Sequence, residues 1–144
     1  MKRKSIIIFL LTLLLYSCTS TKTFKGSADL HGSVYDVKQR PVANCLIIIG
    51  GKEKAKTDSN GRFVVYNLAS GSYEIETKSS YCESYSNTIQ FLNETQYIVI
   101  SLIDAETIYQ LVEDNLGINN LEEAKMNALR LLDINDSDSS ALLY

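Results

Sequence analysis

Apolar and polar residues alternate in short runs between residues 28 and 103, and these runs are rich in β-branched and aromatic side chains. Gly, Asn, Asp and Pro separate the runs, which is typical of β-strands joined by turns. The pattern predicts strands at residues 28–37, 44–49, 54–57, 62–68, 71–78, 88–91 and 96–102. Seven short strands at this spacing predict a mainly β fold, a seven-stranded antiparallel β-sandwich.

The alternation also indicates which side chains point inward, because successive residues of a strand face opposite sides of its sheet. The expected core consists of Val34, Cys45, Ile47, Ile49, Phe63, Val65, Leu68, Tyr73, Ile75, Ile98, Ile100 and Leu102. This set is large enough to form one core.

A turn is predicted at residues 58–61, where the sequence is Asp-Ser-Asn-Gly. These residues tolerate positive φ, and they lie between two predicted strands, so a tight hairpin is expected there. Asp58 and Asn60 also match the start of a calcium loop. The later ligands of such a loop are missing, so the segment is interpreted as a turn and no metal is expected.

From residue 104 the spacing of apolar residues changes to that of helices. A first helix is predicted to end at Gly117, and a second to begin at Asn120, whose side chain can cap it while Glu123 reaches back. Their apolar faces contain Ile108, Leu111, Val112 and Leu116, and then Leu121, Ala124, Ala128, Leu131 and Leu132. The two helices are expected to form a hairpin over residues 104–144.

The first eighteen residues combine a basic head, an apolar run and a cysteine. Lys2, Arg3 and Lys4 precede an apolar run about half as long as the roughly 20 residues that a membrane-spanning helix needs. The run ends in Leu-Tyr-Ser-Cys, which resembles the lipobox of bacterial lipoproteins and implies cleavage before Cys18 and acylation of its thiol. We therefore expect a signal peptide at 1–17, a polar tether at 18–27 and export to an envelope membrane, with the outer membrane favoured. The alternative is an ordinary secretory signal with Cys18 incidental.

Charge is distributed unevenly along the chain. Residues 18–103 contain 9 basic and 8 acidic side chains, whereas residues 104–144 contain 2 basic and 9 acidic ones. A composition break therefore falls near Asp104. The acidic end lacks the positive surface that phosphate backbones select, so no nucleic-acid partner is expected.

Four ordered blocks in the middle of the chain resemble the carboxypeptidase regulatory-like domain. They are GSVYD at 32–36, PVANCLI at 41–47, TDSNGRF at 57–63 and NLASGSYEI at 67–75. The resemblance covers residues 30–102 and implies a transthyretin-like sandwich at 28–103 with an accessory, non-catalytic role. Gln39 and Asn44 depart from it where Gly is usual, although Asn tolerates the left-handed conformation.

The helical end loosely resembles one tetratricopeptide repeat. The likeness rests on Ala124, the segment 128–135 and Ala141-Leu142, although Asp136 stands where such repeats usually have Pro. A lone unit cannot bury a continuous core, so it would pack on the sandwich or on another chain, or remain partly ordered.

Few side chains suit catalysis. His31 is the one histidine, and its phase in the first strand differs from that of inward Val34, so we expect it to be exposed. A nucleophile–histidine–acid triad would have to use this exposed residue, and a zinc-peptidase site would need a second histidine, which the sequence does not contain. No enzymatic activity and no cofactor are therefore expected.

Three groups of residues are candidates for other roles. Cys45 and Cys82 form an even pair in an exported chain, and they are either bridged by a disulfide or packed as free thiols. Lys52, Lys54, Lys56 and Arg62 form a basic row that either binds an acidic partner or lipid headgroups, or protects an edge strand from pairing. Tyr81 and Tyr85, with Asn87, lie in a loop-like stretch and either stack on a sugar or are ordinary sandwich tyrosines.

These observations predict a lipid-anchored envelope protein that acts as a protein-interaction or scaffold module. The protein partner is expected at the C-terminal helices. The alternative is a carbohydrate- or peptide-binding accessory module.

Overall fold

The computed structural model describes residues 24–139, with side chains to residue 134. The predicted signal peptide and Cys18 lie outside this range. The order of the elements is β1 (Ser27–Asp36), β2 (Leu46–Ile49), β3 (Lys52–Lys56), β4 (Arg62–Ala69), β5 (Gly71–Lys78), β6 (Tyr85–Phe91), β7 (Tyr97–Leu102), α2 (Ala105–Gly117) and α3 (Leu121–Ser139). All seven predicted strands and both predicted helices are therefore present, with shifts of a few residues at their ends.

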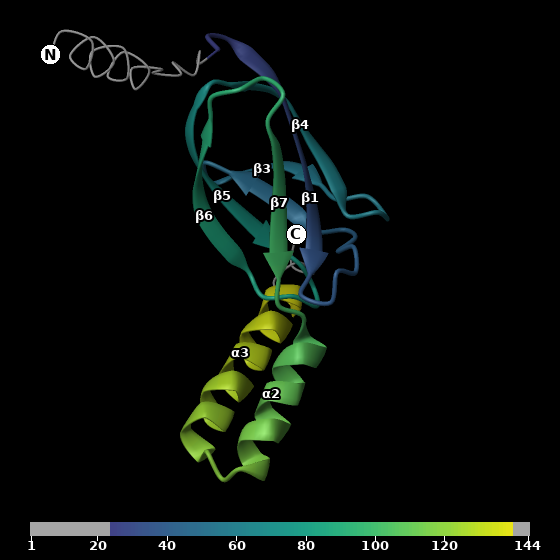
Figure 1. The fold of residues 1–144 in the computed structure, drawn as a ribbon, viewed down its shortest axis with the longest axis vertical. Coiled ribbons are helices and arrows are strands. Elements are labelled where there is room, and N and C mark those ends of the chain that lie inside the picture. Colours follow the sequence, from purple (N-terminus) through teal and green to yellow (C-terminus); the bar gives the residue numbers. More distant parts are fainter. Residues whose placement is uncertain (1–23, 140–144) are drawn as a thin grey trace, which may run out of the picture.

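The strands form two packed sheets, and the helices lie below them (Figure 1). One sheet has the order β4-β1-β7 and the other the order β3-β2-β5-β6. The prediction of an entirely antiparallel sandwich was wrong in one ladder, because β1 and β7 run parallel from His31–Tyr97 to Asp36–Leu102. The chain passes through the whole second sheet between these two strands, which allows the parallel pairing; a hairpin turn allows only antiparallel pairing.

The turn at 58–61 forms as predicted, but the hairpin does not. The Asp58 backbone donates to the Arg62 carbonyl at 2.8 Å, and Gly61 has φ 72°. A side chain at position 61 would also collide with the Val34 carbonyl. β3 pairs with β2 whereas β4 pairs with β1, so this turn joins the two sheets across an open edge.

The core lies between the sheets and matches the expected inward positions. All of them are buried except Tyr73 and Ile98, which pack against the core while remaining half-buried. Four further buried residues were not predicted: Leu30, Val42, Cys82 and Phe91. The Phe24 ring packs edge-on against Phe91, with centroids 5.2 Å apart, and it closes the end of the sandwich where β1 begins.

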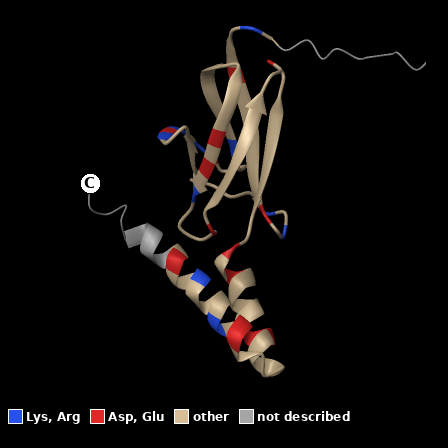
Figure 2. Cartoon of the chain, turned by 90° about the vertical axis from the view of Figure 1, so that its left-hand side faces the viewer, with Lys and Arg blue, Asp and Glu red and all other residues tan. Residues whose placement is uncertain are grey.

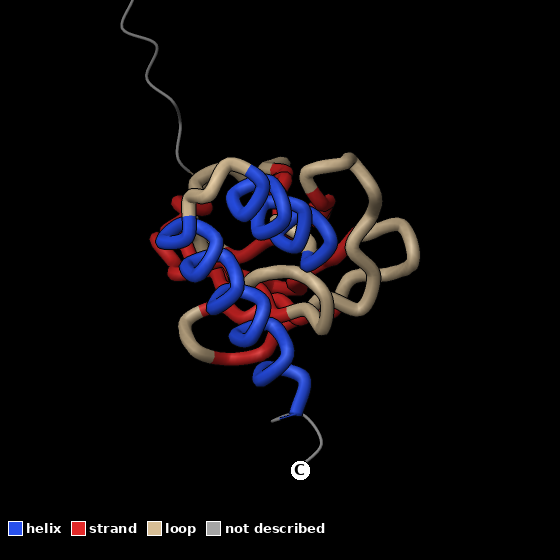
Figure 3. Tube along the Cα trace, turned by 90° about the horizontal axis from the view of Figure 1, so that it is seen from below, coloured by secondary structure: helices blue, strands red, loops and turns tan. Residues whose placement is uncertain are grey.

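The helical hairpin extends from the opposite end of the sandwich (Figures 1 and 3). Asp104 caps α2, since its carboxylate accepts from the Thr107 backbone at 3.1 Å and from the Thr107 hydroxyl at 2.8 Å. The helix ends at Gly117 as predicted, and Asn119, with φ 57°, is the left-handed residue of the turn. The Asn120 side chain donates to Asn115 across that turn.

Two groups of ionic contacts hold the hairpin against the sandwich: Lys38 and Arg40 contact the start of α2, and Arg130 of α3 contacts Glu83. Arg40, in the loop after β1, contacts Asp36 at 2.6 Å and Asp104 at 3.2 Å. On the other helix, the Arg130 guanidinium donates to both carboxylate oxygens of Glu83, at 2.6 and 2.8 Å. A bidentate pair fixes orientation as well as distance, so both helices have a defined position on the sandwich.

Neither helix of residues 24–139 combines the length and apolar character that crossing a bilayer would require.

Candidate functional site

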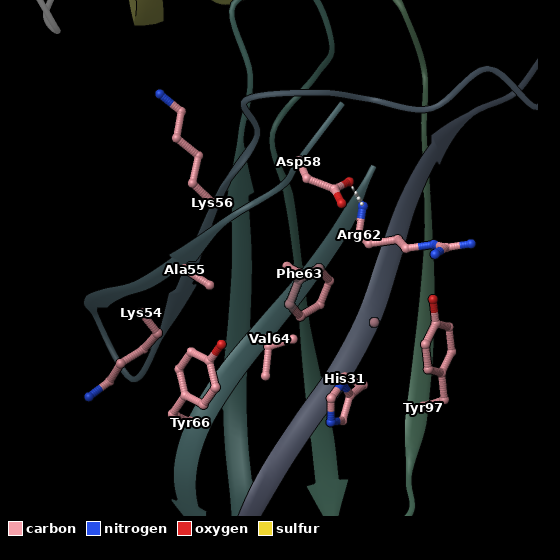
Figure 4. Close-up of a pocket in the computed structure, with 11 residues that line it drawn as sticks. His31, Lys54, Ala55, Lys56, Asp58, Arg62, Phe63, Val64, Tyr66 and Tyr97 are labelled. Atoms are coloured by element: carbon pink, nitrogen blue, oxygen red, sulfur yellow. Dashed lines mark hydrogen bonds between the residues drawn. The ribbon is translucent and has the colours of Figure 1, made fainter. Parts of the chain in front are cut away.

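A groove of about 550 Å³ lies along the open edge where β3 and β4 meet, and it continues over the outer face of the three-stranded sheet (Figure 4). It is lined by His31, Gly32, Lys54, Ala55, Lys56, Asp58, Arg62, Phe63, Val64, Tyr66 and Tyr97. These residues come from β1, β3, β4, β7 and the turn between β3 and β4. The groove therefore depends on the order of the strands and not on any continuous stretch of sequence.

Aromatic side chains form a row across this sheet. His31 pairs with Val64 of β4 on one side and with Tyr97 of β7 on the other. Tyr66 lies two residues beyond Val64 on β4, so it shares the outer face. Figure 4 shows Tyr66 on one side of Val64 and His31, and Tyr97 on the other side; the two tyrosines are 75% and 54% exposed.

Cationic side chains border the row. Lys54 and Lys56 come from β3, and Arg62 comes from the first position of β4. In Figure 4 the Arg62 guanidinium extends toward the side of the groove that carries Tyr97. Asp58 is the one carboxylate among the lining residues. Its Oδ1 accepts from the backbones of Asn60 and Arg62, at 2.8 and 2.9 Å, so it has a structural role in the turn.

The predicted basic row is only partly gathered in the groove. Ile47 pairs with Ala55 and Ile48 with Glu53, so Lys54 is an extra residue that forms a bulge in β3. The bulge interrupts the strict alternation on which a single face for all three lysines was based. Lys54, Lys56 and Arg62 line the groove, whereas Lys52 is exposed at the start of β3 and is not among the lining residues.

Tyr66 and Tyr97 were missed as site residues. Both lie out of phase with the buried positions of their strands, which is the signal that marks an outward face. The sequence shows that they point outward, but it does not show that β1 separates β4 from β7. Only the sheet order reveals that these tyrosines flank His31.

Tyr81 and Tyr85 occupy different surroundings. Tyr81 borders a recess at the junction with the hairpin, together with Asp36, Arg40 and Asp104. Burial raises the pKa of its phenol, and the nearby Cys82 adds to the effect. The loop expected around Tyr85 was wrong: Tyr85 begins β6, packs against the core and accepts a hydrogen bond from Asn87 at 2.9 Å.

The hairpin presents an exposed apolar face. The seam between the helices is marked by Ile108 and Ala124, which are buried. With about 100° of rotation per residue, Tyr109 and Leu116 of α2 turn to the same side of this seam as Leu121, Ala128 and Leu132 of α3. Among these, Tyr109, Leu116, Leu121 and Leu132 are 55%, 54%, 61% and 59% exposed. We call Tyr109, Leu116, Leu121, Ala128 and Leu132 the hairpin face.

The hairpin face overlaps the predicted apolar stripes only in part. Ile108 and Ala124 are buried as a hairpin requires, and Val112 and Leu131 are half-buried. Leu116, Leu121 and Leu132, which were assigned to the same stripes, remain more than half exposed. Two short helices form too narrow a seam to cover every apolar residue, so one side stays open.

Cys45 and Cys82 are free, buried thiols in this structure. Burial raises the pKa of Cys45 to about 11 and that of Cys82 to about 12. Both therefore remain protonated at neutral pH and are poor nucleophiles.

His31 is exposed, as predicted. Within the described part of the chain, no three His, Cys, Asp or Glu side chains are grouped so that they can hold a metal ion.

Comparison with known proteins shows only partial likenesses. No protein-family model matches this sequence, and no curated protein is significantly similar to it. Among solved structures, the C-terminal domain of the Caf1A usher is 15% identical with a TM-score of 0.41, over 54% of this chain and 98% of that domain. A chain of a type II cohesin–X-dockerin complex from Acetivibrio cellulolyticus is 16% identical with a TM-score of 0.47, and the match covers 72% of this chain and 94% of that chain. BcpA, the major pilin subunit of Bacillus cereus, is 16% identical with a TM-score of 0.44, and the match covers 55% of this chain and 30% of BcpA.

Proposed function

We propose that this protein is a non-enzymatic envelope lipoprotein whose helical hairpin binds a protein partner. The observation that carries the proposal is the hairpin face, where four large apolar side chains on two adjacent helices are each more than half exposed. Contiguous exposed apolar surface of this kind commonly marks an interaction site. The ionic contacts of Arg40 and Arg130 support the same role, because they hold the face in one orientation.

The charge around the hairpin face favours a basic amphipathic helix as its occupant. Figure 2 shows acidic residues, in red, on both helices. By the same rotation, Glu113 of α2 and Glu122 of α3 border the hairpin face and form no salt bridge within the described residues, and Lys125 is the one unbridged cation beside them. A second copy of this chain would bring like charges together. A helix with leucines on one side and lysines on the other would match both the apolar face and its acidic border.

The start of the sandwich and the helical hairpin lie at opposite ends of the molecule, which would place the hairpin face away from a membrane that holds the N-terminus. β1 runs parallel to β7, and β7 leads directly into the hairpin, so β1 begins at the opposite end of the sandwich. A lipid on Cys18 would attach near that end. The ten residues of β1 span about 33 Å at about 3.3 Å per residue, so the hairpin would point away from the bilayer.

The lipid anchor has its own test. A Cys18→Ser variant should move from the membrane fraction to the soluble fraction and lose its fatty acid by mass spectrometry. A variant that stays membrane-bound, with no fatty acid on either form, would contradict the anchor.

Partner binding can be tested with a peptide probe and the full-length chain. The probe contains only leucine and lysine, with leucines at helical spacing, and its controls are a peptide with the same composition in alternating order and a leucine–glutamate peptide. Calorimetry should show saturable binding of the helical leucine–lysine peptide alone. The double variant Leu121→Ser/Leu132→Ser should weaken it about tenfold or more, because both side chains belong to the hairpin face.

Val99→Ser is the matched control, since Val99 is an equally exposed apolar residue on the sandwich. Unchanged affinity in the hairpin variant, equal binding of the glutamate peptide, or concentration-dependent dimerisation that the hairpin variant abolishes would each overturn the proposed partner.

The second candidate function, carbohydrate binding, is favoured by a different observation. The exposed tyrosines of the groove, and its cations that form no salt bridge with any described residue, lie on the sandwich and not on the hairpin.

A further inference from the structure

We propose that the groove binds an acidic oligosaccharide, a chain of sugars carrying carboxylates. The sugar rings stack on Tyr66 and Tyr97, and the carboxylates contact Lys54, Lys56 and Arg62. The proposal does not depend on the hairpin, because all these residues belong to β3, β4 and β7.

The aromatic row gives the first reason. Tyr66 and Tyr97 stand on the two outer strands of the sheet, with His31 on the strand between them. Neighbouring strands are about 4.8 Å apart, so β4 and β7 are separated by about 10 Å, and Tyr66 is displaced by two further residues along β4 from the level of His31 and Tyr97. Two exposed rings this far apart suit non-adjacent sugars of one chain, since tyrosine offers an apolar ring face together with a hydroxyl that can hydrogen bond.

The cations give the second reason. Lys38, Arg40 and Arg130 all lie within 4.0 Å of a carboxylate. Among the described residues, Lys54, Lys56 and Arg62 form no such salt bridge, although the chain as a whole has a net charge of -3. Positive charge therefore collects beside the aromatic row, and no carboxylate of the described residues neutralises it through a salt bridge. An anionic ligand can neutralise it, and the guanidinium of Arg62 can bind a carboxylate through two hydrogen bonds.

Gly32 supports the groove from the core side of the three-stranded sheet. Gly32 lies beneath the Phe63 ring, and a Cβ there would come within 2.5 Å of Phe63 and 2.8 Å of Ile98. The absence of a side chain at this position lets the Phe63 ring pack against β1 on the core side of the sheet. On the outer face, the exposed His31 side chain lies on the strand between those of Tyr66 and Tyr97.

The orientation of the row distinguishes a sugar chain from an acidic peptide. A peptide that extends a sheet runs along an edge strand and uses its unpaired backbone groups. Here the aromatic side chains come from three strands and lie across them (Figure 4). The bulge at Lys54 also interrupts the β3 edge, which disfavours strand addition.

The test uses a hexamer of galacturonic acid as the probe and calorimetry on the full-length chain. Maltohexaose, which lacks carboxylates, and a glutamate hexapeptide are the controls. We expect saturable binding of the galacturonate hexamer and none of either control. Tyr97→Ala and Arg62→Gln should each weaken binding about tenfold.

Two exposed residues outside the groove serve as matched controls. Tyr109→Ala and Lys125→Gln remove the same kinds of side chain from the hairpin and should leave binding unchanged. Thermal melting verifies that every variant is folded, and Tyr66→Ala gives a second aromatic variant should Tyr97→Ala melt early.

The outcomes are decisive. Failure of the galacturonate hexamer to bind, equal binding of the glutamate peptide, or equal loss in the groove and hairpin variants would overturn the acidic-sugar site. Because the leucine–lysine peptide tests a different face with different variants, loss of one proposal leaves the other standing.

Discussion

Gly32 lies directly beneath the Phe63 ring, and the added methyl group of an alanine would approach both that ring and the Ile98 backbone. Gly32→Ala should therefore destabilise the fold by about 1–3 kcal/mol, the usual cost of overpacking a well-filled site. Gly71→Ala is the control, because its Cβ would meet nothing nearer than 3.5 Å. Urea denaturation should give a lower midpoint for the first variant alone, and equal midpoints would contradict the packing argument.

The two cysteines provide a second test at this scale. Their raised pKa values, about 11 and about 12, keep both thiols protonated and buried at neutral pH. Iodoacetamide should leave the folded protein unmodified at neutral pH and should alkylate both residues after unfolding in urea without reductant. Mass spectrometry reads the result directly. If the unfolded chain accepts label at these positions only after reduction, a disulfide joins them and the thiol state is excluded.

Two non-glycine residues between β1 and β2 adopt the left-handed backbone conformation. Gln39 has φ 63° and Asn44 has φ 58°. Glycine adopts this conformation most readily, so both residues occupy positions where glycine would be the default choice. For Asn44 the cost is small, because asparagine visits the left-handed region readily.

At the scale of elements, the positions of the strands and helices in the sequence were predictable, but the pairing of the strands within the sheets was not. The alternation around Ile47 and Phe63 specifies a strand and its buried face, and both residues are buried. The alternation contains no information on which strand pairs with which, or on whether paired strands run parallel or antiparallel. β1 and β7 therefore turned out to be parallel, and the segments either side of the 58–61 turn fell into different sheets.

The same reasoning applies to the groove. Lys54, Lys56 and Arg62 were candidates because charged residues cluster in that part of the sequence. Tyr66 and Tyr97 are separated by 31 positions, and they flank His31 only because β1 pairs with both of their strands. A site assembled from three strands requires the sheet order, which pattern reasoning does not supply.

The pair formed by Arg130 and Glu83 makes a prediction for α3. Both side chains are about one-third exposed or less, and the contact is bidentate. Each of Arg130→Gln and Glu83→Gln should lower the local stability of α3 by about 1 kcal/mol, and the double variant should cost little more than one of them. Hydrogen exchange of the α3 amides measures the effect, with Lys125→Gln as a neutral control. Additive losses would show that the two residues do not act as a pair.

At the scale of the whole molecule, the position of the hairpin depends on charges shared between the sandwich and α2. Burial acts to raise the pKa of Asp104, but hydrogen bonds from Thr107 and the charges of Lys38 and Arg40 outweigh it and hold that pKa below its ordinary value of 3.8. The hydrogen bond and charge of Lys38 likewise lower the pKa of Glu106 from 4.5. The loop after β1 therefore binds the start of α2 only while these carboxylates are ionised.

Because the pKa values of Asp104 and Glu106 are both lowered, docking of the hairpin should weaken as the pH falls. A carboxylate whose pKa is lower in the folded state stabilises that state above its ordinary pKa and loses this contribution as pH falls through the folded value. The hairpin should therefore stay docked from neutral pH down to about pH 4.5 and loosen progressively below it. The Thr107 amide, which donates to Asp104, should report the change in an NMR titration.

Substitution of the charges separates this mechanism from general acid unfolding. Arg40→Gln removes a cation that lowers the pKa of Asp104, so the Thr107 transition should move to higher pH. In the double variant Asp104→Asn/Glu106→Gln both ionisable groups are absent, and asparagine still caps a helix well. That variant should lose the pH-dependent step while α2 persists. A transition that keeps its midpoint in both variants, and that coincides with unfolding of the β-strands, would assign the acid response to the sandwich and not to the junction.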